Sequence, residues 1–322
     1  MSLPEALQGA VAAWLAGQGG SRREGTASLS ATYRAGGSSA SIDLGAYLVA
    51  RLPATFAAVA RVLGELAARR PAFSPTSLLD AGSGPGTASW AAAAQWPGLD
   101  AVTFLDSSPH FLDLAAALSR RGPEPLPGAT PVRGSIEALP EGLASDLVVA
   151  AYALAELPLG RAAVIAEGLW RASRQVLVLV EPGTPQGFAR LHAARQQLVA
   201  QGAVPVAPCT HAMACPIVGD DWCHFSVRLA RSRAHMHAKK ARVPFEDERF
   251  AYLVLARAGE PPQGARIIAP PQPAKAGVTL RLCGAGRMAQ RLIARRDAAA
   301  YKQVRKLDWG DLLGPANEED AT

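Results

Sequence analysis

One segment constrains the fold of this chain more than any other. It reads Leu78-Leu79-Asp80-Ala81-Gly82-Ser83-Gly84-Pro85-Gly86-Thr87: an apolar run that ends in an acid, a glycine-rich turn and the start of a helical stretch. The three glycines, Gly82, Gly84 and Gly86, let the backbone approach a ligand without Cβ clashes. This order predicts a strand, a nucleotide-binding turn and a helix at the beginning of an α/β domain.

Two acids at strand ends indicate which nucleotide the turn binds. In a dinucleotide enzyme the turn would hold a pyrophosphate, which Asp80 would repel, whereas a carboxylate suits the amino group of a methionine moiety. Asp106 ends the next apolar run, where a carboxylate can accept both hydroxyls of a ribose. The combination favours S-adenosylmethionine, and an NAD or sugar-nucleotide domain is the alternative.

The adenine and acceptor positions depart from the general pattern. Ser135 and Ile136 stand where class I methyltransferases often present an acid to the adenine amino group, so either backbone groups hold the base there or the affinity for the cofactor is weak. Tyr152 and Glu156 are candidates to face the methyl group. The chain lacks the Asn/Asp-Pro-Pro-aromatic loop of amino-methylating enzymes. Methyl transfer depends mainly on alignment, so the sequence leaves catalysis open and identifies no acceptor.

Short apolar runs alternate with helical stretches from residue 77 onward, which predicts a parallel sheet with helices on both faces. The fold class is therefore α/β, a class I S-adenosylmethionine-dependent methyltransferase (Rossmann-like) sheet with additions. We expect an N-terminal helical region at 1–75, a methyltransferase-like domain at 76–260 with a cysteine-containing insert at 204–249, and a basic C-terminal extension at 261–322. The expected strands are Ser77–Ala81, Ala101–Leu105, Thr130–Arg133, Leu147–Ala151, Gln175–Val180, Phe250–Arg257 and Val278–Cys283. The expected helices are Thr87–Gln95, Pro109–Arg121, Gly160–Ala172 and one near Gly187–Gln201, preceded by Ala6–Ala16 and Ala46–Arg70.

Composition and the N-terminus suggest a cytoplasmic protein. The chain has 322 residues, of which 49% are hydrophobic, and this suffices for a real core. We find no apolar window of about 18 residues, the length that spans a bilayer, and the N-terminus lacks the order of a signal peptide. A monomer without a membrane partner is expected, and its cysteines should be reduced thiols or metal ligands.

The four cysteines, Cys209, Cys215, Cys223 and Cys283, form the second notable pattern. The first three follow C-x5-C-x7-C, and the fourth is distant in sequence. Four thiolates suit a tetrahedral zinc ion or an iron–sulfur cubane. The tight C-x2–4-C knuckle of structural zinc sites is absent, which favours the cluster, while zinc and the absence of any metal stay open.

Basic residues flank the cysteines on both sides, and the net charge is +6. Arg287, Arg291 and Arg295 recur at i, i+4 spacing, which predicts a basic helix. A basic platform tied together by a metal site could neutralise the phosphates of a structured RNA. The candidate RNA-binding residues are Arg228, Arg231, Arg233, Lys239, Lys240, Arg287, Arg291, Arg295, Lys302 and Arg305.

Three runs, Glu181–Pro185, Asp221–Phe225 and Pro244–Leu253, resemble the methyltransferase-like family of small-ribosomal-subunit assembly proteins, which is best known from mitochondria. The resemblance covers about residues 40–310 and suggests a bacterial member. It implies a class I methyltransferase fold, a [4Fe–4S] cluster, and binding to small-subunit ribosomal RNA during assembly. The four cysteines match the cluster ligands of the family. The rival functions are an active rRNA methyltransferase and a small-molecule methyltransferase with a structural zinc.

Overall fold

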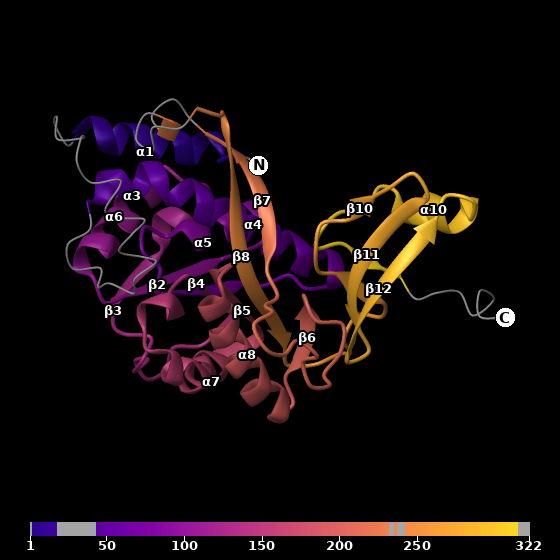
Figure 1. The fold of residues 1–322 in the computed structure, drawn as a ribbon. Coiled ribbons are helices and arrows are strands. Elements are labelled where there is room, and N and C mark those ends of the chain that lie inside the picture. The colour runs from indigo at the N-terminus through magenta and orange to yellow at the C-terminus, as the bar shows by residue number, and fades with distance from the viewer. Residues whose placement is uncertain (1, 18–42, 232–234, 237–241, 315–322) are drawn as a thin grey trace.

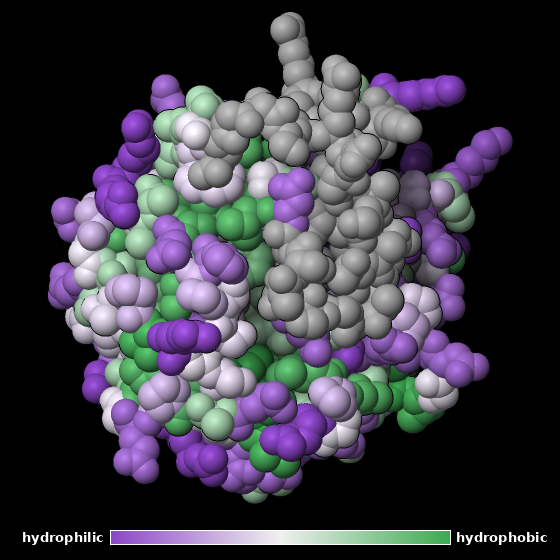
Figure 2. All heavy atoms as spheres, turned by 90° about the vertical axis from the view of Figure 1, so that its left-hand side faces the viewer, coloured by the Kyte–Doolittle hydropathy of each residue, from purple (hydrophilic) through white to green (hydrophobic). Residues whose placement is uncertain are grey.

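The computed structural model describes residues 2–17, 43–231, 235–236 and 242–314. They form a large sheet with helices on both faces and a smaller C-terminal sheet that lies beside one end of it (Figure 1). On the face that Figure 2 shows, hydrophilic side chains project at the edge of the molecule, and hydrophobic side chains are visible among the hydrophilic ones across the face.

The large sheet has eight strands in the order β3-β2-β1-β4-β5-β8-β6, with β7 pairing to β8. Strands β1 to β5 are parallel, and β8 runs antiparallel between β5 and β6. This topology is that of a class I methyltransferase, so the predicted fold class is confirmed. The strands are β1 Ser77–Ala81, β2 Ala101–Asp106, β3 Thr130–Arg133, β4 Ser145–Ala151, β5 Ser173–Pro182, β6 Val204–Ala207, β7 Phe225–Ala230 and β8 Phe245–Ala256.

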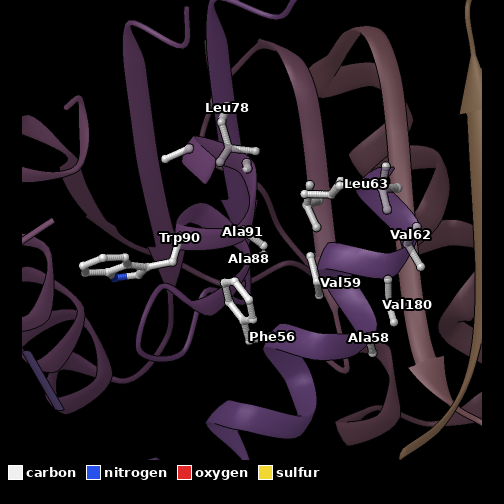
Figure 3. Close-up of a cluster of buried hydrophobic side chains, with 14 of the residues drawn as sticks. Phe56, Ala58, Val59, Val62, Leu63, Leu78, Ala88, Trp90, Ala91 and Val180 are labelled. Carbon is white, nitrogen blue, oxygen red and sulfur yellow. The ribbon is translucent and has the colours of Figure 1, made fainter. Parts of the chain in front are cut away.

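The helices bury their apolar sides against the two faces of this sheet. Helices α4, α5 and α6 cover one face, and α7 and α8 cover the other. Figure 3 shows Phe56, Val59 and Val62 of α4 among Ala88 of α5 and Val180 of β5. The helices are α4 Leu52–Arg69, α5 Thr87–Gln95, α6 Pro109–Ser119, α7 Ala162–Ala172 and α8 Pro185–Ala200, and the short 3-10 helices are Leu126–Gly128, Leu154–Glu156 and Leu159–Arg161.

The N-terminal part contains α1 (Glu5–Gly17), and the expected long helix Ala46–Arg70 is divided into α3 (Leu44–Ala50) and α4. Pro53 lies in the first turn of α4, where its missing N–H and its ring end the preceding helix. Among the described residues no single helix is long and apolar enough to cross a membrane, although α3 and α4, bent by 48°, meet the requirement as a pair.

The C-terminal sheet replaces a helix that the sequence led us to expect. Arg287, Arg291 and Arg295 were predicted on a basic helix, but β12 (Arg287–Ala294) is a strand paired along its length with β11 (Gly277–Gly284). A spacing of four residues also keeps side chains on one face of a strand, so the prediction was wrong about the element. The remaining elements are β9 Ala265–Ile267, β10 Gln272–Pro273, α10 Ala298–Val304 and β13 Leu312–Leu313.

Candidate functional site

The glycine turn after β1 lies at the base of a hollow at the carboxyl ends of the parallel strands. Gly82, Gly84 and Gly86 have φ angles of 70°, 51° and 78°, a left-handed conformation that favours glycine. A Cβ at Gly82 would lie 2.6 Å from the Cβ of Ala153, so the turn and the loop after β4 fit only without a side chain at residue 82. The hollow is lined by Tyr47, Gly82, Gly84, Asp106, Ser107, Phe111, Gly134, Ser135, Ile136, Ala151, Tyr152, Ala153, Glu156 and Leu157.

Asp106 connects the wall of this hollow to the glycine turn. Its Oδ2 accepts the N–H of Gly84 at 2.8 Å, and its Oδ1 accepts the N–H of Ser108 at 2.8 Å. Burial raises the pKa of Asp106, and the backbone hydrogen bonds oppose that effect. Asp106, Ser135 and Ile136 thus line the same hollow, as the sequence predicted for a nucleoside site.

Asp80, in β1, and Gly86, the last glycine of the turn, are not among the residues that line the hollow. The Oδ2 atom of Asp80 accepts hydrogen bonds from the N–H and the hydroxyl of Ser89 at 3.0 and 2.8 Å. Burial raises the pKa of Asp80 to about 7, although both bonds to Ser89 lower it. A Cβ at Gly86 would lie 3.0 Å from the ring of Phe104. The structure thus gives Asp80 a contact with the first turn of α5, which the sequence did not reveal.

Tyr152 and Glu156 line the same hollow after β4. Tyr152 has a φ of 61°, which is strained for a residue with a bulky side chain. Its hydroxyl donates to Glu248 Oε1 at 2.9 Å, and Arg51 Nη2 lies 3.4 Å from the same oxygen. Burial and the neighbouring Glu248 raise the pKa of Tyr152 well above its usual value. These contacts connect the rim of the hollow to β8 and to the break between α3 and α4.

All four cysteines line a second cavity, between α8, β8 and the C-terminal sheet. Burial and the charges of Cys209 and Cys215 raise the pKa of Cys283 to about 12. Burial, followed by the charges of the other three cysteines, raises the pKa of Cys223 well above its usual value. Mutual repulsion of this kind is relieved when thiolates bind a cation. No group of three or more His, Cys, Asp or Glu side chains in the described part of the chain is arranged to hold a metal ion.

With these two sites described, the chain can be compared with known proteins. A sequence model described as "Mitochondrial small ribosomal subunit Rsm22" matches residues 41–314. This chain belongs to the Rsm22 family. A human relative, "Ribosome assembly protein METTL17, mitochondrial", is 35% identical over 290 residues, which are 83% of this chain and 61% of the human protein. This Rsm22-family chain therefore spans less than two thirds of the length of that relative.

Two solved methyltransferase structures match this Rsm22-family protein at low sequence identity. Magnesium protoporphyrin IX methyltransferase from Synechocystis PCC 6803 with bound S-adenosylhomocysteine has a TM-score of 0.43 and 16% identity, over 72% of this chain and 95% of that one. Precorrin-6y C5,15-methyltransferase from Geobacter metallireducens GS-15 has a TM-score of 0.39 and 17% identity, over 61% of this chain and 86% of that one.

The basic residues predicted to bind RNA fall into two groups in this Rsm22-family structure. Arg228, on β7, binds both carboxylate oxygens of Asp247 at 2.7 and 2.8 Å, and Arg231 Nε lies 3.3 Å from Glu246 Oε2. The carboxylates of Asp247 and Glu246, both on β8, thus partly neutralise the charges of these two arginines. Arg233, Lys239 and Lys240 lie outside the described residues.

The second group belongs to the C-terminal sheet. Arg287 and Arg291 are exposed on β12, and the guanidinium of Arg295 lies 5.7 Å from the ring centroid of Tyr301. The last two candidates lie on or next to α10: Lys302 in its last turn and Arg305 as its C-cap.

Sequence reasoning missed two buried arginines in the wall of the cysteine cavity, Arg195 of α8 and Arg266 of β9. An arginine is usually exposed, and neither position belongs to a motif. Their position beside the cysteines becomes evident only when the helices and strands are packed together.

Proposed function

We propose that this Rsm22-family protein binds S-adenosylmethionine in the hollow, holds a [4Fe–4S] cluster on its four cysteines, and binds small-subunit ribosomal RNA to assist assembly of the small ribosomal subunit. The observation that carries the proposal is the cysteine cavity beside a methyltransferase fold. Cys209, Cys215 and Cys223 come from the segment between β6 and β7, and Cys283 comes from β11, yet all four line one cavity.

The geometry of the hollow supports S-adenosylmethionine. Ligands of open α/β sheets bind at the carboxyl ends of the strands, where the glycine turn exposes backbone to the hollow. Asp106 would accept the ribose hydroxyls, and backbone groups at Ser135 and Ile136 would hold the adenine. The bound cofactor supplies an electrophilic methyl group. Tyr152 and Glu156 would face it, since they line the remaining wall.

The donor set supports a metal cluster in the second cavity. All four candidate ligands are thiols, the ligands of [4Fe–4S] clusters. A cubane distributes its ligands over a larger volume than a single ion does, which suits four cysteines around one cavity. The cluster would hold β11 against α8 and β8 and so would contribute folding free energy to the C-terminal sheet.

The exposed arginines of β12 support contact with RNA. Arg287 and Arg291 lie on a strand that also extends from the cysteine cavity, because Cys283 pairs with Met288 of β12. A cluster that fixes β11 would also fix these arginines. Their charges can neutralise phosphates and release counterions.

Anaerobic purification with iron, sulfide and zinc counts tests the cluster. We expect four irons per chain and broad visible absorption, and we expect Cys215→Ser to bleach the protein. Zinc without iron would contradict the cluster and favour the small-molecule methyltransferase alternative.

A Gly84→Asp variant separates cofactor binding from ribosome binding. The Cβ of residue 84 would face the Tyr47 hydroxyl at 3.7 Å, so the new carboxylate would enter the hollow. Gly142→Asp is the matched control, since Gly142 also has a positive φ, of 80°, but has nothing within 4 Å of an added Cβ. We expect loss of cofactor binding in Gly84→Asp alone, with binding to the small subunit intact.

Labelled S-adenosylmethionine and immature small subunits decide whether the protein is also an enzyme. Stoichiometric transfer of label to the RNA would show an active rRNA methyltransferase. Assembly assistance with no transferred label is the expected outcome for a non-catalytic factor.

A further inference from the structure

A buried arginine with no carboxylate partner among the described residues lies against the cysteine cavity. Arg195, on α8, is 4% exposed. Its Nε donates to Cys209 Sγ at 3.2 Å, and its Nη2 donates to the carbonyl groups of His211 and Met213, both at 2.8 Å. None of these partners in the described chain carries a full negative charge while Cys209 is a thiol. A buried charge in this state is costly unless an anion is close.

A second arginine has a buried N–H group for which the part of the chain that the structure describes offers no acceptor. Arg266, on β9, is 1% exposed and lines the same cavity. Its Nε donates to Pro208 O at 2.9 Å, and its Nη1 binds Glu65 Oε1 at 2.6 Å and Gly310 O at 2.8 Å. Its Nη2 atom is buried and has no partner among the described residues. Such a group costs about 1–3 kcal/mol, and native proteins rarely leave one.

Both observations indicate an occupant of the cavity that is negative and accepts hydrogen bonds. An iron–sulfur cluster on four cysteines meets both requirements. The four thiolate charges exceed what the iron–sulfide core offsets, so the complex is a net anion, and its sulfurs accept N–H hydrogen bonds. The electron added on reduction makes the complex more negative, so nearby positive groups stabilise the reduced cluster more than the oxidised one.

We propose that Arg195 and Arg266 are the counter-charges of the cluster: each donates N–H groups to its sulfurs, and together they favour its reduced form. The inference rests on the proposed cluster and names positioning residues for it. The hydrogen bond from Arg195 to Cys209 is already formed. The Nη2 atom of Arg266 would donate to a sulfur of the cluster when the cavity is filled. Removing either charge lowers the reduction potential, because the reduced cluster loses more stabilisation than the oxidised one.

The test compares the full chain with Arg195→Gln, Arg195→Lys, Arg266→Gln and the control Arg257→Gln, all purified anaerobically. Arg257 is a suitable control, since it binds the carbonyl groups of Ser173 and Trp170 and does not line the cavity. Measurements are iron and sulfide per chain, the rate of iron release to a chelator, and the midpoint potential from a dye-mediated titration.

We expect Arg195→Gln and Arg266→Gln to lower the reduced-to-oxidised ratio at a fixed potential by about tenfold, which corresponds to about 59 mV for one electron. Both should also release iron faster. Arg195→Lys, which keeps the charge, should lie between Arg195→Gln and the unaltered protein. Arg257→Gln should not differ from the unaltered protein.

Each outcome decides the proposal. Potentials unchanged in both glutamine variants at full iron content overturn it and leave the cluster itself standing. If Arg195→Gln retains no iron, Arg195→Lys decides: retention by the lysine variant supports the counter-charge, and equal loss overturns it. Absence of iron and sulfide in the unaltered protein overturns this inference together with the proposed function.

Discussion

Replacing Glu65 by glutamine tests the buried ion pair that joins α4 to the C-terminal sheet. The Oε1 atom of Glu65 lies 2.6 Å from Arg266 Nη1 and 2.9 Å from Arg69 Nε. The side chains of Glu65 and Arg266 are 7% and 1% exposed. Glutamine keeps the size of the side chain and an acceptor oxygen but removes its charge, so no carboxylate would remain among the described partners of Arg266.

The expected cost follows from that burial. Removing one partner of a buried pair destabilises a protein by about 3–5 kcal/mol, a large part of the total free energy of unfolding of about 5–15 kcal/mol. Arg69 is 28% exposed and regains solvation, so we expect a value near the lower end, about 3 kcal/mol. Urea-induced unfolding followed by circular dichroism, at equal metal content, measures it.

The control is Glu167→Gln on α7. Glu167 pairs with Arg171 at the same i, i+4 spacing, but the side chain of Arg171 is 72% exposed, so this variant should lose less than about 0.5 kcal/mol. Equal losses in the two variants, or a loss below about 1 kcal/mol for Glu65→Gln, would refute the argument that burial makes the Glu65 pair matter.

The same pair predicts a pH dependence. Burial raises the pKa of Glu65, but Arg266 and Arg69 outweigh it and leave the pKa below its usual value of 4.5. A carboxyl group with a depressed folded pKa contributes stability above its unfolded pKa and loses it as the pH falls through the folded pKa. The loss of unfolding free energy in Glu65→Gln should therefore become smaller below pH 4.5. A loss that stays constant across acid pH would contradict the ion pair.

Three further predictions concern the hollow, a buried acid and the basic strand. Gly82→Ala should weaken binding of S-adenosylmethionine by about tenfold in calorimetry. The new Cβ meets Ala153 and, together with left-handed strain of about 1–2 kcal/mol, would displace the turn from its position in the hollow; unchanged affinity would contradict the fit of the two loops. Burial raises the pKa of Glu181 to about 8 from 4.5, so its ionisation lowers stability as the pH rises from 4.5 to about 8. Glu181→Gln should then gain stability relative to the unaltered protein over that interval, and a gain that does not vary with pH would argue against the raised pKa. The double variant Arg287→Gln, Arg291→Gln should reduce the slope of log affinity for small-subunit rRNA against log salt by about 2, whereas an unchanged slope would exclude β12 from the phosphate contacts.

Local sequence was sufficient for much of the methyltransferase-like sheet. The bounds of β1, β3 and α5 agree with the predicted ranges to the residue, because a buried parallel strand, a glycine turn and an apolar helix each leave a pattern within ten residues. The break at Pro53 also had a local cause, since proline cannot occupy a helix interior.

Strand β12 of the C-terminal sheet was not accessible to the same reasoning. Arg287 and Arg291 are four residues apart, which places them on one side of a helix and equally on one face of a strand. Pairing with β11 decided between the two, and that pairing is a tertiary event. Strand β9 lies inside the stretch at 261–322 that we expected only as a basic C-terminal extension.

The sequence alone determined the identity of the chemical groups: the glycine turn, Asp106 and the four thiols. Only the tertiary structure decided which groups meet. It placed Asp80 against Ser89 and away from the hollow, and it brought Arg195 and Arg266 to the cysteines from separate elements. The physical reason is that turns and helices depend on neighbours in sequence, whereas burial and the pairing of charges depend on neighbours in space.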